Sequence, residues 1–297
     1  MNASAERQLK KHKGKIVWIA SYPKSGNTWM RAFLTALLYE GTPKINHLLS
    51  DFSLYNKSLF EDYISLDPSL LLPSEILEYE IRIVRSIVDN ADSDRMLFSK
   101  VHHNVPSFVE PDSTHAVIYI VRNPLGIVPS LANHNQSSYE RAINCMNDSN
   151  YQYSAQRKGL HNEILLPQRI GKWNTHVTNW LRINDVPVIL MRYEDMLLKP
   201  KESFGSLIEQ LDLEFSDEEL VRAIQQSSFK MLRAQEEEVS FKEKNPKTKH
   251  FFRKGSWESW KEELTMKQKD QIIQRHKSVM RQLRYPIDLN AYELPTI

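Results

Sequence analysis

Five consecutive residues between an apolar run and an apolar helical pattern have the side-chain types of an anion-binding turn. Lys24 supplies a cation, Ser25, Asn27 and Thr28 supply hydrogen-bond donors, and Gly26 lets the backbone approach a ligand closely. The N–H groups at the start of the following helix, together with its dipole, favour a bound anion. The pattern is not the GxxxxGK[ST] loop of nucleoside triphosphatases, because the lysine here precedes the glycine. A solvated turn that ends in a helix cap is the alternative.

A second polar cluster follows another apolar run. Residues 123–124 are Asn and Pro, which suit the N-cap and the first position of a helix. Arg122, directly before them, has a planar guanidinium that can bind a phosphate through two hydrogen bonds. The expected helix contains Gly126 and Pro129, which are unusual inside helices. The alternative is a helix cap whose arginine forms a surface ion pair.

A strongly basic segment lies nearer the C-terminus. Residues 242–254 contain six lysines and arginines but only one acidic residue, Glu243. Charge runs of this kind are usually solvated loops. For a ligand that carries several phosphate or sulfate groups, we expect the segment to close over the site and to become ordered on binding.

Two adjacent histidines, His102 and His103, follow a third apolar run, which contains Lys100. Histidine titrates near neutral pH and is the side chain most often used as a general base. Successive side chains of a strand point to opposite faces, so at most one of the two is expected to enter a site. The other histidines lack the spacing of a metal site such as HExxH, and no GxSxG sequence of a serine hydrolase occurs. We therefore expect no metal cofactor.

The elements that must position these residues are short buried strands alternating with helices. Apolar runs rich in β-branched and aromatic residues predict strands at 16–20, 96–101, 116–121 and 186–193. Helical spacing predicts helices at 28–39, 74–88 and 168–183. Continuous apolar runs are typical of a parallel sheet covered on both faces. The sequence therefore predicts a three-layer α/β/α fold with a central parallel sheet, in which ligands bind beyond the carboxyl ends of the strands.

Composition excludes several classes of protein. The 39 basic and 37 acidic residues leave a net charge of +2, which argues against binding nucleic acid by bulk electrostatics. A single cysteine cannot form an intrachain disulfide framework or a cysteine-rich zinc site, and it favours a reducing compartment. The sequence contains no apolar run long enough to span a membrane. We expect a cytoplasmic protein with one domain over residues 1–297.

The sequence YPKSGNTW at residues 22–29 resembles the 5′-phosphosulfate loop of the cytosolic-type sulfotransferases, commonly YPKSGTTW. Enzymes of this family transfer a sulfuryl group from 3′-phosphoadenosine 5′-phosphosulfate (PAPS) to a hydroxyl or amine and release 3′-phosphoadenosine 5′-phosphate (PAP). The resemblance implies that Lys24 contacts the leaving oxygen, that residues 25–28 hold the 5′-phosphate, and that Trp29 stacks on adenine. Asn27 replaces a threonine of the family sequence but remains polar.

Further matches follow in the order expected of the family. Arg122 and Ser130 keep the eight-residue offset of its 3′-phosphate motif. The sequence RKGSWESWK resembles its RKGxxGDWK loop, with Glu258 and Ser259 in place of Gly-Asp. By this resemblance the donor-binding residues also include Arg253, Lys254 and Gly255 and, near adenine, Ser228, Phe229 and Tyr193, the last expected to end the fourth strand.

The sequence Lys100-Val101-His102 resembles the start of the family's KTHLP sequence, whose histidine is the catalytic base. The resemblance nominates His102 as the base, with Lys24 and Lys100 stabilising charge on the sulfuryl group and the leaving oxygen. His103 is a rival, because it begins the stretch where this chain departs from the Leu-Pro of the family. A non-catalytic PAPS- or PAP-binding module and a phosphate-loop nucleotide kinase are the alternative functions.

The acceptor side is less defined by the sequence. We expect residues 42–72 and 131–168 to cap the site, and we expect a small-molecule acceptor whose chemical class stays open. Apolar side chains of the first segment either line an acceptor pocket or pack in the core; they are Leu49, Phe52, Leu54, Tyr55 and Phe60. Residues 261–270 resemble the family's dimerisation segment, KxxxTVxxxE, which implies a homodimer. Thr265 as a helix N-cap explains its threonine equally well.

Overall fold

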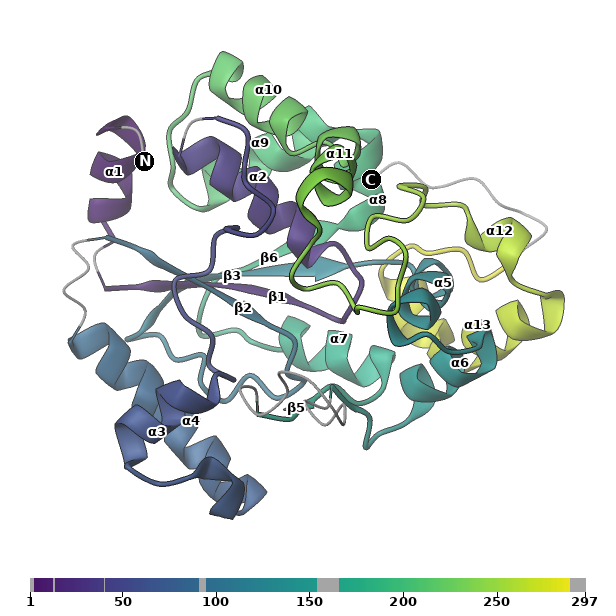
Figure 1. The fold of residues 1–297 in the computed structure, drawn as a ribbon, viewed down its shortest axis with the longest axis horizontal. Helices are drawn as coiled ribbons and strands as arrows, with labels where there is room; N and C mark the ends of the chain where they lie inside the picture. The colour runs from purple at the N-terminus through teal and green to yellow at the C-terminus, as the bar shows by residue number, and fades with distance from the viewer. Residues whose placement is uncertain (1–2, 13, 40, 91–94, 154–165, 289–297) are drawn as a thin grey trace.

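A four-stranded parallel sheet forms the centre of the molecule, with helices on both of its faces (Figure 1). The computed structural model describes residues 3–12, 14–39, 41–90, 95–153 and 166–288. In spatial order the strands are β2 (Leu97–Val101), β1 (Ile16–Ser21), β3 (Thr114–Val121) and β6 (Val188–Arg192). The four predicted strands are confirmed, with ends that differ from the prediction by no more than about two residues.

The central strands of the sheet are buried on both faces. Side chains alternate along β1, so Trp18 packs into one core and Ile19 into the other, and Tyr119 and Ile118 of β3 divide in the same way. Every residue of β1 is buried. The continuous apolar runs therefore reflect two covered faces, and the three-layer α/β/α fold is confirmed.

The helices of the two outer layers pack on different cores. On the Ile19 side they are α1 (Ala3–Lys10), α2 (Asn27–Tyr39), α8 (Tyr193–Leu198), α9 (Pro200–Gln210) and α10 (Asp217–Gln226). On the Trp18 side they are α4 (Pro73–Asp89), α5 (Pro124–Asn135), α6 (Tyr139–Asn147), α7 (Trp173–Leu181) and α13 (Met266–Gln282). The shorter or outlying elements are α3 (Lys57–Ile64), η1 (Pro68–Leu70), α11 (Phe229–Val239), α12 (Trp260–Glu263) and the antiparallel pair β4 (Gln152–Tyr153) and β5 (Gln168–Arg169). Within the described ranges, no helix has both the length and the apolar character needed to cross a membrane.

The helix predicted at 168–183 is wrong at its start. Residues 168–169 form β5, and α7 begins only at Trp173. Gly171 has a φ of +64°, and a Cβ there would lie 2.6 Å from the side-chain nitrogen of Asn104. The chain therefore turns at this glycine, close to a neighbouring loop, before the helix can begin.

The carboxyl ends of the strands lie along one edge of the sheet. Residues near these ends pair across the sheet, Ala20 with Val101, Ser21 with Ile120, and Val121 with Arg192. The residues that follow the strands therefore start at the same edge; they are Tyr22, His102, Arg122 and Tyr193. This edge is where the sequence predicts ligand binding.

Tyr193 does not end the fourth strand, as the sequence analysis predicted. Strand β6 ends at Arg192, and Tyr193 is the first residue of α8. The next two residues, Glu194 and Asp195, are acidic and favour a helix start because they complement the positive end of the helix dipole. The tyrosine still lies at the carboxyl edge of the sheet.

Candidate active site

The turn after β1 has the backbone conformation of a tight anion-binding loop. Lys24 and Gly26 both have positive φ, +69° and +114°. A Cβ on Gly26 would lie 2.8 Å from the ring of Tyr193, so only glycine fits there. The Asn27 amide donates a hydrogen bond to the Ile19 carbonyl oxygen at 2.8 Å, which fastens the turn to the strand below it.

Polar groups of this turn remain without partners in the ligand-free structure. The Ser25 hydroxyl is buried and has no hydrogen-bond partner. Asn27 and Thr28 begin α2, whose first N–H groups have no carbonyl within the helix to bind. A buried hydroxyl and free N–H groups at one helix start are the donors that a phosphate oxygen accepts.

The Lys24 ammonium lies among other cations. Its Nζ is 3.5 Å from the centre of the Phe251 ring, which gives it a cation–π contact. Burial and, to a smaller extent, the charges of Lys100 and Arg122 together lower the pKa of Lys24 to about 7. An anionic ligand would therefore relieve repulsion among three side chains.

Arg122 is fixed at the end of β3. Its guanidinium carbon lies 4.2 Å from the centre of the Tyr193 ring, and its Nη1 donates to the Lys24 carbonyl oxygen at 3.2 Å. Its Nε is buried and has no hydrogen-bond partner. A Cβ on Gly126 would lie 3.2 Å from that Nε, which explains a glycine inside α5. Ser130 lies further along the same helix and is half-buried.

Aromatic rings meet between α2, α8 and α11. The rings of Trp29 and Tyr193 contact edge to face, 5.8 Å between centres. Trp29 and Phe229 pack against the same small apolar cluster. Ser228 is the N-cap residue of α11, although its side chain makes no capping bond. Gly255 has a φ of +64°, and a Cβ there would lie 2.7 Å from the Phe229 ring.

Arg253 and Lys254 are paired with one carboxylate of α12. Nη1 and Nη2 of Arg253 lie 2.5 Å and 2.9 Å from the two oxygens of Glu263, and Lys254 Nζ lies 3.2 Å from one of them. Tyr139 donates to the same carboxylate at 2.9 Å. Burial raises the pKa of Glu263, but the hydrogen bonds from Arg253 and Tyr139 outweigh it and hold the pKa at about 2.

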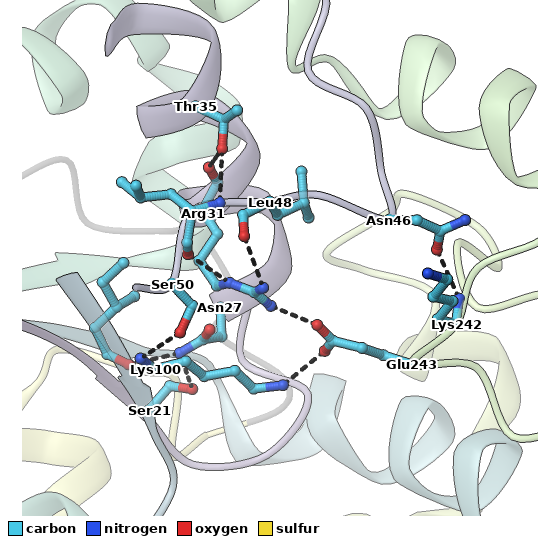
Figure 2. Close-up of polar contacts among 12 residues, drawn as sticks. Ser21, Asn27, Arg31, Thr35, Asn46, Leu48, Ser50, Lys100, Lys242 and Glu243 are labelled. Atoms are coloured by element: carbon cyan, nitrogen blue, oxygen red, sulfur yellow. Dashed lines mark hydrogen bonds and ion pairs between the residues drawn. The ribbon is translucent and has the colours of Figure 1, made fainter. Parts of the chain in front are cut away.

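A second carboxylate, Glu243, joins Lys100 to Arg31 (Figure 2). Both distances are 2.6 Å, one to each carboxylate oxygen. Arg31 is held in turn by the carbonyl oxygens of Leu48 and Leu49, to which its Nη2 and Nε donate. Burial raises the pKa of Glu243, but Lys100 and Arg31 outweigh it, so the pKa lies well below its usual range.

Residues 240–254, called the closing segment from here on, are fastened at several points. The side-chain oxygen of Asn46 accepts a hydrogen bond from the Lys242 N–H at 2.8 Å, and its amide nitrogen donates to the Ser240 carbonyl oxygen at 2.9 Å. Asn245 donates to the His134 carbonyl at 2.7 Å, and the Glu236 carboxylate accepts from the N–H of Phe251 at 2.5 Å. Figure 2 shows Asn46 and Lys242 side by side next to the Glu243 pair. The closing segment is therefore a loop with several exposed lysines that is nevertheless anchored at specific points.

The two adjacent histidines point to different surroundings. Nδ1 of His102 lies 2.7 Å from the Ser21 carbonyl oxygen. A carbonyl can only accept, so Nδ1 carries the proton and Nε2 keeps a free lone pair. His103 bonds within its own loop to Val105, and its ring stacks on Tyr55 at 5.7 Å. Both residues lie just after the end of β2, and their rings contact different neighbours.

Both rings are neutral. Burial and the charge of Lys100 lower the pKa of His102 to about 3, against the opposing effect of its hydrogen bond to the Ser21 carbonyl oxygen. Burial also lowers the pKa of His103 to about 4. His102 therefore holds a basic lone pair beside a lysine ammonium at the edge of the sheet.

The apolar residues expected to cap the acceptor side belong to the core. Leu54, Tyr55 and Phe60 are buried with Trp18, Phe52 packs against that cluster, and Leu49 packs with Ile19. Of the other capping segment, 131–168, residues 154–165 lie outside the described residues. The ring of Tyr153, at the edge of that gap, lies 6.4 Å from the ring of His102.

The sequence analysis missed several residues that shape the site. Arg31 lies within an apolar helix, and nothing in its neighbours marks it. Glu243 was noticed only as the one acid in a basic run, and that rarity is the available signal. The sequence also gave no reason to single out His176 or Phe251, whose contacts join segments distant in the chain. Among the described residues, no group of three potential metal-ligating side chains is present.

The parallel sheet, with Lys24, Lys100 and Arg122 gathered at its carboxyl edge, defines an α/β protein with a candidate anion-binding site. Residues 15–284 match the sulfotransferase domain family. The chain belongs to that family and is a sulfotransferase, an enzyme that transfers sulfuryl groups.

Named relatives share about a quarter of their residues with this chain. The amine sulfotransferase of Oryctolagus cuniculus is 24% identical over 288 residues, covering 92% of this chain and 84% of its own. Sulfotransferase 1A1 of Bos taurus is 24% identical over 280 residues, covering 87% and 80%. Both alignments extend over most of each protein.

Solved structures share the fold. Retinol dehydratase in complex with androsterone and inactive cofactor PAP aligns with a TM-score of 0.60 at 20% identity, covering 92% of this chain and 83% of the other. Mouse sulfotransferase SULT7A1 complexed with PAP aligns with a TM-score of 0.56 at 17% identity, covering 94% and 88%.

Proposed function

We propose that this enzyme transfers a sulfuryl group from PAPS to a hydroxyl or amine of a small-molecule acceptor, with His102 as the general base. The observation that carries the proposal is the bond from His102 Nδ1 to the Ser21 carbonyl, which leaves the Nε2 lone pair available beside Lys100. Neutral imidazole with one free lone pair is the form that accepts a proton.

The donor is proposed to lie along the carboxyl edge of the sheet. Residues 24–28 would bind the 5′-phosphosulfate, because they offer free donors and a cation at a helix start. Arg122 and Ser130 would bind the 3′-phosphate, with Arg253, Lys254 and Gly255 closing over it. The adenine would lie among Trp29, Tyr193, Ser228 and Phe229. PAP-bound neighbours in the fold support this donor.

The transfer itself is an in-line displacement at sulfur. The acceptor oxygen or nitrogen gives its proton to His102 Nε2 and forms a bond to sulfur. The bond from sulfur to the phosphate oxygen of PAPS breaks, and PAP leaves with the electron pair. Lys24 and Lys100 stabilise the negative charge that develops on the leaving oxygen and the sulfuryl group.

The low pKa of His102 arises from burial and from the nearby charge of Lys100, against which the carboxylate of Glu243 acts only weakly. A bound donor brings several negative charges, which stabilise the imidazolium and raise the pKa of His102 toward its usual value. We therefore expect the base to gain strength when PAPS binds, at the moment when proton transfer is needed.

The test is to incubate the protein with PAPS and an acceptor library and to measure both PAP release and products heavier by one SO₃ group. His102→Ala should lower kcat by about 100-fold or more, the usual contribution of a general base. His103→Ala is the matched control and should retain kcat. The reverse pattern would move the base to His103.

Tight PAP binding by calorimetry without turnover of any acceptor would favour a non-catalytic binding module, and magnesium-dependent consumption of ATP would favour a nucleotide kinase.

Other properties are proposed from the same family membership. The named relative that acts on amines keeps amine acceptors within the library. Thr265 is the N-cap of α13, since its Oγ1 accepts from the Gln268 N–H at 3.3 Å. A homodimer through residues 261–270 and a cytoplasmic location remain proposals, tested by light scattering of the purified protein and by cell fractionation.

A further inference from the structure

Helix α7 directs two side chains at one short piece of backbone. His176 and Trp180 are four residues apart and lie on the same face of the helix. His176 Nε2 lies 3.0 Å from the carbonyl oxygen of His102, and Trp180 Nε1 donates to the carbonyl oxygen of His103 at 2.8 Å. Two successive carbonyls after β2 are therefore bound by side chains of one helix.

The proton positions on His176 are fixed by its partners. The side chain is fully buried, and burial lowers its pKa to about 3, so the ring is neutral. The His102 carbonyl can only accept, so Nε2 carries the proton. Nδ1 then accepts a hydrogen bond from the Tyr119 hydroxyl at 2.9 Å. The ring also contacts Tyr22 edge to face at 5.3 Å.

His102 lies just beyond the point where the sheet stops holding β2. The last residue of β2 in register with β1 is Val101, paired with Ala20. His102 is thus held by two bonds of different kinds, one from its side chain to the Ser21 carbonyl and one from His176 to its own carbonyl. The first orients the ring, and the second fixes the backbone that carries it.

We propose that His176 is a positioning residue for the base, which it holds through the main chain without touching a substrate. This inference rests on the proposed function, in which His102 is the base. Loss of the His176 bond frees the backbone at His102, so Nε2 moves relative to the acceptor. A displacement of about 1 Å costs about 100-fold in rate. The His176 bond does not reach the donor turn, which His176 meets only through the ring contact with Tyr22, so nucleotide binding should change little.

The experiment uses the full-length enzyme with PAPS and the best acceptor from the library. His176→Leu should lower kcat by about 10- to 100-fold, while KM for PAPS and the Kd for PAP stay within about threefold. His176→Gln, whose amide nitrogen can replace Nε2 as donor, should restore most of the rate. Tyr119→Phe, which removes only the group that fixes the tautomer, should lower kcat by an intermediate, roughly threefold amount.

Trp180→Phe is the control for general loss of packing. This side chain is buried on the same helix face and donates to the His103 carbonyl instead. Trp180→Phe should lower the melting temperature about as much as His176→Leu does. Its kcat should stay nearer to that of the wild type. Equal losses of kcat in the two variants would overturn the proposal, because they would show a structural effect alone.

The pH profile gives a second readout. The groups that face His102 are Lys100 on β2, His176 on α7, Glu243 on the closing segment, the Ser21 carbonyl and the Tyr153 ring on β4. With its backbone freed, His102 becomes more solvated, and its pKa rises toward 6.5. The acid limb of the kcat/KM profile should therefore move to higher pH in His176→Leu. A profile that is only scaled down contradicts the proposal.

The outcomes separate this inference from the proposed function. Turnover that survives His102→Ala would refute the base itself. An inactive His102→Ala variant together with wild-type kcat in His176→Leu would overturn the positioning role alone. If His176→Leu does not fold, Tyr119→Phe and His176→Gln decide the question, since wild-type kcat and pH profile in Tyr119→Phe would also contradict it.

Discussion

The turn at residues 22–28 and the closing segment at residues 240–254 both bring cations to the same edge of the sheet, but they are held in different ways. The turn is fixed by backbone conformation and by the bond from Asn27 to the Ile19 carbonyl. The closing segment is fixed largely by side-chain contacts to distant elements, above all Glu243 to Lys100 and Arg31. The turn therefore keeps its shape through its own backbone and its bond to β1, whereas the segment is held by contacts that a ligand's anions can replace.

The carboxylate of Glu263 adds to this difference between the turn and the closing segment. Glu263 holds Arg253 and Lys254 as Glu243 holds Lys100 and Arg31. In the ligand-free enzyme, four cations near the proposed donor site thus have protein carboxylates as partners. Lys24 instead faces an aromatic ring, and the pKa of its ammonium is lowered by burial and by its cationic neighbours. PAPS would compete with protein carboxylates for the cations at the closing segment. At the turn it would meet hydrogen-bond donors that the backbone already holds in place.

The largest expected effect comes from Gly26→Ala. A Cβ at φ +114° would lie 2.8 Å from the Tyr193 ring, so the variant must distort the turn or displace the tyrosine. Strain of about 3 kcal/mol corresponds to about 100-fold weaker PAP binding, measured by calorimetry. Because the turn is anchored to β1, the melting temperature should fall as well. Retained affinity would show that the turn is not rigid.

Gly255→Ala makes the corresponding change in the closing segment. The Cβ would lie 2.7 Å from the Phe229 ring at φ +64°. Here the ring and the segment can both shift, so about 10-fold weaker PAP binding is expected, with little change in melting temperature. A fall in melting temperature as large as that of Gly26→Ala would contradict the distinction between the two regions.

Local sequence predicts the turn far better than the segment. The strands, the α2 start and the glycine at 26 are adjacent in the chain, so their spacing carries the information. The ion pair of Glu243 with Arg31 joins residues more than 200 positions apart in the chain. No local sequence pattern encodes such a contact. The sequence shows only that a glycine at position 126 is unusual inside a helix. The position of the Arg122 guanidinium, which a Cβ at residue 126 would crowd, explains the glycine.

The same reasoning separates the two histidines. The sequence prediction that at most one of His102 and His103 enters the site used the alternation of a strand, but β2 ends at Val101, before both residues. Their partners depend on long-range packing: His176 reaches His102 from another helix, and Tyr55 reaches His103 from a loop. The helix start at 173 was mispredicted because Gly171 packs against Asn104, which lies far earlier in the chain.

Proton uptake on binding tests the electrostatics of the turn. The pKa of Lys24 is about 7 in the ligand-free protein, and bound phosphate raises it. PAP affinity should therefore fall about 8-fold between about pH 6.5 and about pH 8, with net proton uptake at the higher pH. Calorimetry in buffers of different ionisation enthalpy measures that uptake. Its absence at pH above 7 would show that Lys24 is fully charged before binding.

The free energy of unfolding without PAP should rise with pH, whereas PAP affinity falls. The folded pKa of Lys24 lies below its unfolded value of 10.5, so the unfolded state binds more protons between about pH 7 and about pH 10.5. Lys24 therefore contributes stability that rises with pH across that window, while PAP binding weakens. Denaturation with and without PAP at several pH values separates the two trends. Lys24→Met, which cannot titrate, should remove both.

The smallest effect is expected from Glu243→Gln, and it tests whether the closing segment competes with the donor. Removing the carboxylate's charge frees Lys100 and leaves Arg31 with its bonds to the carbonyls of Leu48 and Leu49. PAP binding should tighten about threefold at low salt, and the gain should shrink at high salt because charge interactions are screened. Glu78→Gln, a change of the same charge at an exposed ion pair with Arg82 on α4, is the control and should leave affinity unchanged. Weaker binding in Glu243→Gln would mean that the carboxylate organises the site for the donor, so that the segment, like the turn, is preformed.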